Sequence, residues 1–231
     1  MTITGEIHGL KKGTVFLQKI EDTSLISVDS MVLFNDPKFT LYTQVDSGPE
    51  IYYLYLDKKD NSKFDDRLSF FVEPGEIHID TTLDKFEEDA IIKGSENEKK
   101  LQEYQKMLRR FNRENLKLIK IDYEAQKQKD YPKLQEVDKQ FESLLRKKYL
   151  YTINFALNNK HLEVAPYVVM SEVFDANVAY LDTVAQALRP RVRKSTYGQQ
   201  LLQLIEKRKK ERTLIKEAPA TDSTQVSNLS Q

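Results

Sequence analysis

Apolar and polar residues alternate with a period of two from Thr2 to about Lys93, which is the pattern of strands with one buried face. Clusters of Gly, Pro, Asn, Asp and Ser interrupt the alternation at short intervals and predict turns. About eight short strands are expected, and such regular punctuation favours an antiparallel sandwich or an open barrel. The predicted strands cover residues 2–8, 14–20, 25–33, 38–42, 51–56, the two arms of 68–80, and 90–93.

The segment 68–80 is the element around which this region is organised. Residues 73–75, Glu-Pro-Gly, predict a turn, because Pro presets one turn dihedral and Gly accepts the positive one. The sequence predicts a β-hairpin laid over a core, with His78 on the opposite, solvent-facing side. The side chains expected to face the core are Leu68, Phe70, Val72, Ile77 and Ile79.

The period changes at Ser95, which precedes Glu98 by the three-residue spacing of a capping box and therefore predicts a helix start. Apolar residues then recur at steps of three and four, which indicates a long helix with a narrow apolar seam. Whether this seam packs within the chain or against a second copy stays open at this point. The seam consists of Leu101, Tyr104, Leu108, Phe111, Asn115 and Leu118.

A break is expected at Tyr131-Pro132, because proline disfavours helical geometry in the residue before it. A second helix follows, ends near residues 158–159 and forms a helical hairpin with the first. Its apolar residues are Leu134, Val137, Phe141, Leu144, Leu145 and Tyr149. Shorter helices are predicted at 164–174, 178–188 and 196–212, the last with Leu201, Leu202, Leu204 and Ile205 on its apolar face.

The predicted fold class is therefore α+β, with an N-terminal antiparallel β-sandwich followed by a C-terminal helical bundle that contains a long helical hairpin. The expected divisions are a sandwich domain at 1–95, a helical domain at 96–215 and a tail at 216–231. Ala, Pro, Thr, Ser, Gln and Asn dominate the tail, so it is predicted to be disordered.

Composition narrows the function classes. The 231 residues include 36 Lys and Arg and 36 Asp and Glu, so no net field attracts nucleic acid or an anionic membrane. The absence of cysteine excludes disulfides, thiol nucleophiles, iron–sulfur clusters and thiolate zinc sites in this chain. No apolar run approaches the roughly 20 residues of a membrane helix. The chain is expected to be cytoplasmic, or exported with its signal removed.

The residues that could bind a metal or act in catalysis are interpreted as surface or loop residues without such a role. His8, His78 and His161 have no partner at zinc-ligand spacing, and His78 is interpreted as a surface histidine on a polar strand face. The acidic loop 57–66 lacks the glycine and the closing glutamate of a calcium loop and contains three lysines, so a solvated loop is favoured over calcium binding. Residues 87–89, Glu-Glu-Asp, are read as a solubilising loop rather than a catalytic pair.

Motifs for catalysis or nucleotide binding are not found. The seven glycines form neither a Gly-x-Ser-x-Gly elbow nor a phosphate-binding loop. Basic clusters occur at 109–113, 189–194 and 207–212, on predicted helices with interspersed acidic residues. They are interpreted as outer faces of the helical bundle rather than nucleic-acid sites. The sequence therefore predicts no catalytic, cofactor-binding or metal-binding residue, and the chain is not expected to be an enzyme.

Aromatic residues mark the one candidate binding surface. Tyr52, Tyr53 and Tyr55 lie in one predicted strand, beside Phe70 and Phe71 in the next, which places aromatic rings on both faces of these strands. If Tyr52 and Phe71 both point outward, an exposed aromatic patch with Tyr53 would mark a partner or ligand surface. The alternative is that the helices cover this face.

Several short motifs resemble an N-terminal domain of unknown function that precedes the thioredoxin-like domain in cell-envelope thiol-disulfide oxidoreductases of one group of Gram-negative bacteria. The similar residues in the first part are Ile3-Thr4-Gly5, Val28-Asp29-Ser30, Phe39, the segment 71–77, Lys93-Gly94-Ser95 and Asn97. The helical region is similar to the segment that joins the two domains in that family, with 164–167, 195–198, Leu201 and Ile205 in the same order.

The resemblance implies export and a lipid anchor attached before the present Met1. It does not carry over the redox activity, which in that family resides in a Cys-x-x-Cys pair that this chain lacks, although Ala218-Pro219 is similar to the entry into the thioredoxin-like domain. The expected function is that of a non-catalytic envelope lipoprotein that binds an unknown protein or small ligand, but no nucleic acid, with a homodimer left open. The alternative is the non-catalytic N-terminal part of a thiol-disulfide oxidoreductase.

Overall fold

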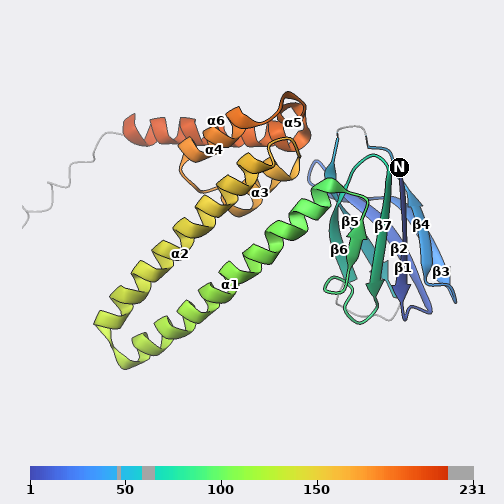
Figure 1. Cartoon of the computed structure of the whole chain (residues 1–231), viewed down its shortest axis with the longest axis horizontal. Coiled ribbons are helices and arrows are strands. Elements are labelled where there is room, and N and C mark those ends of the chain that lie inside the picture. The colour runs from blue at the N-terminus through green and yellow to red at the C-terminus, as the bar shows by residue number, and fades with distance from the viewer. Residues whose placement is uncertain (46–47, 59–65, 218–231) are drawn as a thin grey trace, which may run out of the picture.

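The computed structural model describes residues 1–45, 48–58 and 66–217, with side chains described up to residue 211. Figure 1 shows two parts, a β-sandwich at the N-terminal end and a group of helices from which two long helices project as an arm. The α+β architecture expected from the sequence is confirmed, since the strands come first and all helices follow them.

Within the described residues the sandwich has eight strands in two four-stranded sheets. One sheet has the order β4-β1-β7-β8 and the other β3-β2-β5-β6. The inward-facing side chains of both sheets form one core, which includes Leu68, Phe70, Val72, Ile77 and Ile79, as predicted. The bounds are β1 Thr2–His8, β2 Lys12–Glu21, β3 Ser24–Phe34, β4 Lys38–Tyr42, β5 Glu50–Asp57, β6 Asp66–Val72, β7 Glu76–Thr82 and β8 Ile91–Lys93.

The predicted hairpin of residues 68–80 is wrong. Strand β6 pairs with β5 in one sheet, whereas β7 pairs with β1 and β8 in the other, so the turn at 73–75 carries the chain from one sheet to the facing one. The alternation of Phe70, Val72, Ile77 and Ile79 could not separate these two arrangements. Two strands that face each other across a core require the same apolar alternation as two strands that are hydrogen-bonded side by side.

The pairing of β1 with β7 is parallel, while the other pairs are antiparallel, so the sandwich is mixed rather than antiparallel throughout. Gly5 in β1 lies opposite Ile79 in this parallel pair. A Cβ atom at Gly5 would lie 2.1 Å from the backbone oxygen of Ile79 and 2.5 Å from the ring of Phe39. The absence of a side chain at Gly5 therefore permits the close approach of the two strands.

Helix α1, Glu96–Gln128, and helix α2, Tyr131–Asn158, form the arm. The helix start predicted at Ser95 is confirmed, because the Ser95 hydroxyl accepts a hydrogen bond from the Glu98 N–H at 2.9 Å. The seam of α1 packs within the chain: the Tyr104 hydroxyl lies 2.8 Å from that of Thr152, and its ring lies against Tyr151 and Phe155 of α2. These contacts answer the question that the sequence left open.

The remaining helices gather at the base of the arm (Figure 1). They are α3 Val164–Glu172, α4 Val178–Ala187, α5 Pro190–Lys194 and α6 Thr196–Glu217. The short α5 was not predicted, and α6 continues past residue 212 to include the first two residues assigned to the tail. The rest of the predicted tail, 218–231, and most of the acidic loop 57–66 lie outside the described residues.

Candidate functional site at the domain junction

The exposed aromatic patch, which the sequence left open, is not formed. Register pairs Tyr52 with Phe70 on the inner face of the sheet, and Ile51 with Phe71 on the outer face. Tyr52 is consequently buried in the sandwich core, while Phe71 is buried beneath the helices. Tyr53, on the outer face, is half-buried against the same helices. The alternative interpretation, that helices cover this face, is confirmed.

Phe71 lies at the centre of an apolar junction between the sandwich and the helices. Its ring meets the rings of Tyr167 and Tyr197 edge-on, with centroids 5.3 and 6.0 Å away. Such edge-to-face pairs are favourable because the ring edge is electropositive and the ring face electronegative. The buried members of this cluster come from both parts of the chain and are Ile51, Phe71, Leu101, Tyr104, Phe155, Leu162, Val164 and Val168.

Glu98 ties the first turn of α1 to β6 beside this cluster. Its carboxylate accepts a hydrogen bond from the Phe71 backbone N–H at 2.9 Å and another from the Gln102 side chain at 3.0 Å. The residue is only 3% exposed. Burial raises the pKa of Glu98, because removal from water disfavours the charged form, while the two hydrogen bonds act in the opposite direction.

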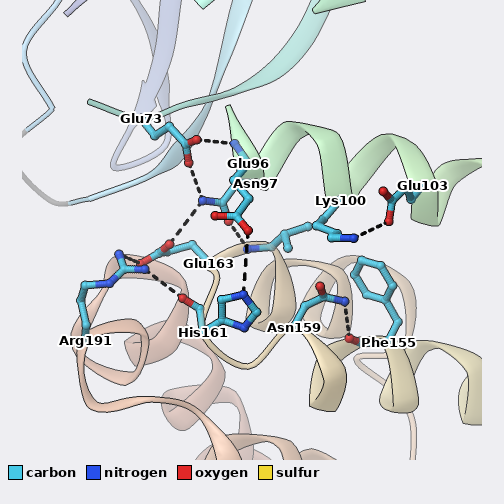
Figure 2. Close-up of polar contacts among 11 residues, drawn as sticks. Glu73, Glu96, Asn97, Lys100, Glu103, Phe155, Asn159, His161, Glu163 and Arg191 are labelled. Atoms are coloured by element: carbon cyan, nitrogen blue, oxygen red, sulfur yellow. Dashed lines mark hydrogen bonds and ion pairs between the residues drawn. The ribbon is translucent and has the colours of Figure 1, made fainter. Parts of the chain in front are cut away.

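Asn97 forms a second polar link next to Glu98 (Figure 2). Its side-chain amide donates to Glu73 at 2.7 Å and to Glu163 at 3.4 Å, and its carbonyl oxygen accepts from the Val164 N–H at 2.8 Å. Glu73 also accepts a hydrogen bond from the backbone N–H of Glu96. One buried amide thus joins the sheet crossover, the start of α1 and the start of α3.

Glu163 is fully buried and receives its charge partner from α5 (Figure 2). The Arg191 guanidinium donates to the Glu163 carboxylate at 2.6 Å and to the His161 backbone oxygen at 2.9 Å. An ion pair of this kind offsets the cost of burying a carboxylate, especially where a second donor, here Asn97, is present. The network therefore holds three elements of the helical region in one arrangement against the sandwich.

Helix α6 contacts the same sheet at the neighbouring strand β5, where Ile51 pairs with Phe71. The Tyr197 hydroxyl accepts a hydrogen bond from the Ile51 N–H at 2.9 Å, and the Thr196 hydroxyl donates to the Glu50 carboxylate at 2.5 Å. Burial raises the pKa of Tyr197, so this hydroxyl keeps its proton at any physiological pH. The first and last helices of the region both anchor to the same sheet, which restricts rotation of the arm relative to the sandwich.

An open cleft of about 580 Å³ lies beside Glu98, between α1 and the sandwich. The sandwich side supplies Glu87 and Glu88, which the sequence assigned to a solubilising loop, and the helix side supplies Lys106 and Arg109. Gln102 and Gln105 also line the cleft and add amide groups to these charges. The cleft therefore presents acidic, basic and amide groups together, which suits a ligand or peptide segment that carries both charges.

All three histidines are exposed, as was predicted for His78. His8 lies 2.6 Å from Asp80, His78 lies 3.1 Å from the Thr4 hydroxyl, and His161 lies 4.0 Å from Glu96. Across the described ranges, no group of three or more His, Asp or Glu side chains is arranged to hold a metal ion. In the same ranges, no helix combines the length and apolarity needed to cross a membrane.

Sequence reasoning missed the network of Asn97, Glu163 and Arg191. A signal was present at Glu163, a lone acidic residue in the apolar run 162–169, because such a residue needs a partner if the run is buried. No comparable signal marks Arg191, which belongs to a basic cluster interpreted as an outer face. Its side chain is indeed 62% exposed, although its guanidinium reaches the buried carboxylate.

Comparison with known proteins finds a match for the first part of the chain. Residues 1–101 match the family model described as "Domain of unknown function (DUF4369)". The match spans the whole sandwich and the first turn of α1, including Asn97 and Glu98 of the junction. No curated protein matches this chain.

Proposed function

We propose that this chain is a non-catalytic cell-envelope protein, held at the membrane by a lipid anchor, that binds a partner through the cleft between its sandwich and its helices. The resemblance of its motifs to an envelope-associated domain motivates the location. The match to a domain of unknown function agrees with that resemblance but names no activity. The function is binding, with the two parts of the chain each supplying one wall of the site.

The observation that carries this proposal is the composition of the cleft. Glu87 and Glu88 come from the sandwich, and Lys106 and Arg109 come from α1, so a bound group of either charge finds an opposite one. Gln102 and Gln105 add amide donors and acceptors, which match the backbone of a peptide. We therefore favour a peptide segment of a partner protein, with acidic and basic side chains, as the ligand.

A fixed junction supports this function. Two walls that belong to different parts of the chain form one binding site only if their separation is constant. The hydrogen bonds of Glu98 and Asn97 supply that constraint within one or two turns of the cleft. A preorganised cleft loses less conformational entropy on binding than one that must first close.

Site-specific photo-crosslinking in cells of the source tests the proposal. A photoreactive amino acid at Gln105, in the cleft, should give an adduct with a partner protein, and Arg109→Glu should reduce its yield. The matched control is the same amino acid at Arg110, which follows Arg109 on α1, is exposed and does not line the cleft. Equal adducts at both positions, or none at Gln105, would reject the cleft as the binding site.

The envelope location has its own test. Fractionation of source cells should place the endogenous protein in the membrane fraction, and it should become soluble after removal of its lipid. Recovery in the cytoplasm would contradict the location without bearing on the cleft.

The alternative function is the non-catalytic part of a thiol-disulfide oxidoreductase. It is favoured by the order of the motifs in the helical region, which is similar to the segment that joins two domains in those enzymes. Intact mass spectrometry of the endogenous protein separates the two functions. A mass that exceeds 27.0 kDa by the mass of about 100 or more residues would favour the oxidoreductase. A mass of 27.0 kDa plus that of a lipid would favour the lipoprotein.

A further inference from the structure

The cleft beside α1 opens onto the edge of one of the two sheets. In the order β3-β2-β5-β6, strand β6 comes last, so among the described residues it has a neighbouring strand on one side only. Leu68 and Ser69 of β6 both line the cleft. An edge strand presents backbone N–H and C=O groups that can pair with another chain. The direction of these groups in β6 therefore determines what the cleft can bind.

Two hydrogen bonds establish this direction. The N–H of Phe71 donates to the Glu98 carboxylate, and the N–H of Ile51, which lies opposite Phe71 in β5, donates to a hydroxyl of α6. Both N–H groups thus point away from the β5–β6 ladder, so these two residues form a non-hydrogen-bonded pair. Such pairs alternate with hydrogen-bonded ones along antiparallel strands. Phe70 therefore bonds to β5, whereas the N–H and C=O of Ser69 point out of the sheet edge.

Ser69 is the position at which another strand can pair. At Phe71 the Glu98 carboxylate already takes the outward N–H, as the carbonyl of an added strand would. At Ser69, which is half-buried, the part of the chain that the structure describes provides no partner for the outward groups. Beyond Glu98, α1 diverges from β6 (Figure 1), and the cleft lies between them. One residue of an antiparallel strand can exchange two hydrogen bonds with Ser69.

We infer that the ligand of the cleft is an extended peptide segment that pairs with β6 as an additional strand. This inference rests on the binding function proposed above and specifies the conformation of the bound segment. In strand addition, main-chain hydrogen bonds supply affinity and the alternate side chains supply specificity. The cleft volume of about 580 Å³ suits a short segment, whereas a second folded sandwich would bring its own α1 to the same edge.

The walls of the cleft predict the pattern of the segment. The side chains of an added strand alternate between the two faces of the sheet. On the inner face they meet Ala90 and Ile92, which line the cleft and pack against the sandwich core. On the outer face, which carries Phe71, they meet α1, where Lys106 and Arg109 line the cleft. The segment should therefore alternate apolar and acidic residues.

The loop before β8 adds one further preference. Glu87 and Glu88 line the sandwich side of the cleft. They favour a basic residue in the same segment, in addition to the acidic residues that face α1.

Selection of random linear peptides displayed on phage, against the immobilised full chain, tests the inference. The enriched peptides should show the apolar and acidic alternation, and Arg109→Glu should weaken their binding. Ser69→Pro should weaken it about tenfold, because proline removes the outward N–H that pairs with the peptide. Proline is tolerated in edge strands at such positions, and circular dichroism checks that the variant folds.

Val32→Pro is the matched control. Val32 lies in β3, the opposite edge of the same sheet, and the same alternation across β5 and β2 gives it an outward N–H. It is 67% exposed and lies outside the cleft. This variant should bind the selected peptides like the unmodified chain.

Amide hydrogen exchange of the unmodified chain, measured by NMR, tests the pairing without any substitution. Saturation with a selected peptide should slow exchange of the Ser69 N–H about tenfold or more, because it gains a hydrogen bond. The N–H of Phe70 already bonds to β5, so it should be protected with and without peptide. This measurement decides the matter if Ser69→Pro does not fold.

The outcomes separate this inference from the function on which it rests. Peptides that lose binding on Arg109→Glu but leave Ser69 exchange unchanged would make the cleft a binding site without strand addition, and the inference would be wrong. If no peptide is enriched, or none responds to Arg109→Glu, the inference and the proposed peptide ligand are both rejected. A concentration-dependent dimer that Ser69→Pro abolishes would replace the peptide by a second copy.

Discussion

The carboxylate of Glu98 in α1 accepts a hydrogen bond from the backbone N–H of Phe71 in β6 at 2.9 Å. This contact joins the first turn of α1 to a strand residue whose own side chain is buried under the helices. Glu98→Ala should lower the free energy of unfolding by about 1–3 kcal/mol, the cost of leaving a buried N–H unpaired. Urea unfolding measures the loss, and Glu98→Gln, which keeps an acceptor oxygen, should retain most of the stability.

The pH dependence of stability should also depend on Glu98. Burial raises its pKa in the folded state above its ordinary value of 4.5, so the folded state binds this proton more tightly than the unfolded state. The contribution of Glu98 is therefore most favourable below pH 4.5 and declines as pH rises from there through the raised folded pKa. Urea unfolding at several pH values should show this loss of stability with rising pH in the unmodified chain but not in Glu98→Gln. Identical profiles would mean that Glu98 titrates in its ordinary range.

Asn97→Asp should open the junction in a pH-dependent manner. The new carboxylate would face Glu73 and Glu163, where the amide now donates two hydrogen bonds, so repulsion replaces attraction. Hydrogen exchange at Val164, whose N–H binds the Asn97 side chain, should accelerate, and more at pH 7 than at pH 4.5. Asn112→Asp, an exposed change on the same helix, serves as the control and should leave Val164 protected.

Arg191→Ala should destabilise the protein because it leaves the buried carboxylate of Glu163 without its cation. We expect a loss of about 1–3 kcal/mol, below the value for a fully buried pair, since Arg191 is itself largely exposed. A double-mutant cycle with Glu163→Gln isolates the interaction. If Arg191→Ala costs as much in the Gln background as alone, the ion pair is not the source of the effect.

Phe70→Ala and Phe71→Ala should have different structural effects, because Phe70 lies in the sandwich core and Phe71 in the cluster between the sandwich and the helices. Both side chains are fully buried, and each substitution should cost about 3–5 kcal/mol. Phe70 lies within the sandwich, so its loss should accelerate hydrogen exchange in β1 and β7 as well as β6. Phe71 lies under the helices, so its loss should expose α3 and the start of α1 while the sandwich stays protected. The reverse pattern would contradict the facing of β6.

The sequence patterns that predicted the structure correctly depend on residues close together in the chain. The strand bounds at residues 2–8 and 38–42 and the helix start after Ser95 agree with the structure, because alternation and capping depend on neighbours within a few residues. The choice of pairing partner for β6 does not depend on such neighbours. Alternation states that Phe70 is buried, but not which sheet lies beside its strand.

The candidate site was less accessible to prediction than the fold. Glu98 was recognised as a capping residue. Its carboxylate, however, accepts a hydrogen bond from the backbone N–H of Phe71, which lies 27 residues away in the chain. The cleft residues Glu87 and Arg109 were interpreted as unrelated surface charges, since nothing in their spacing indicates that the sandwich and α1 bring them to one place.

The sequence by itself determined an α+β chain, with short alternating strands, then a helical hairpin whose seam was visible at steps of three and four. Only the tertiary structure decided that the chain crosses between sheets at Pro74, that helices cover Phe71, and that Asn97 reaches Glu163, 66 residues away. Periodicity reports whether a side chain is buried. It carries no information on what buries it, because water is excluded equally well by any apolar surface that fits.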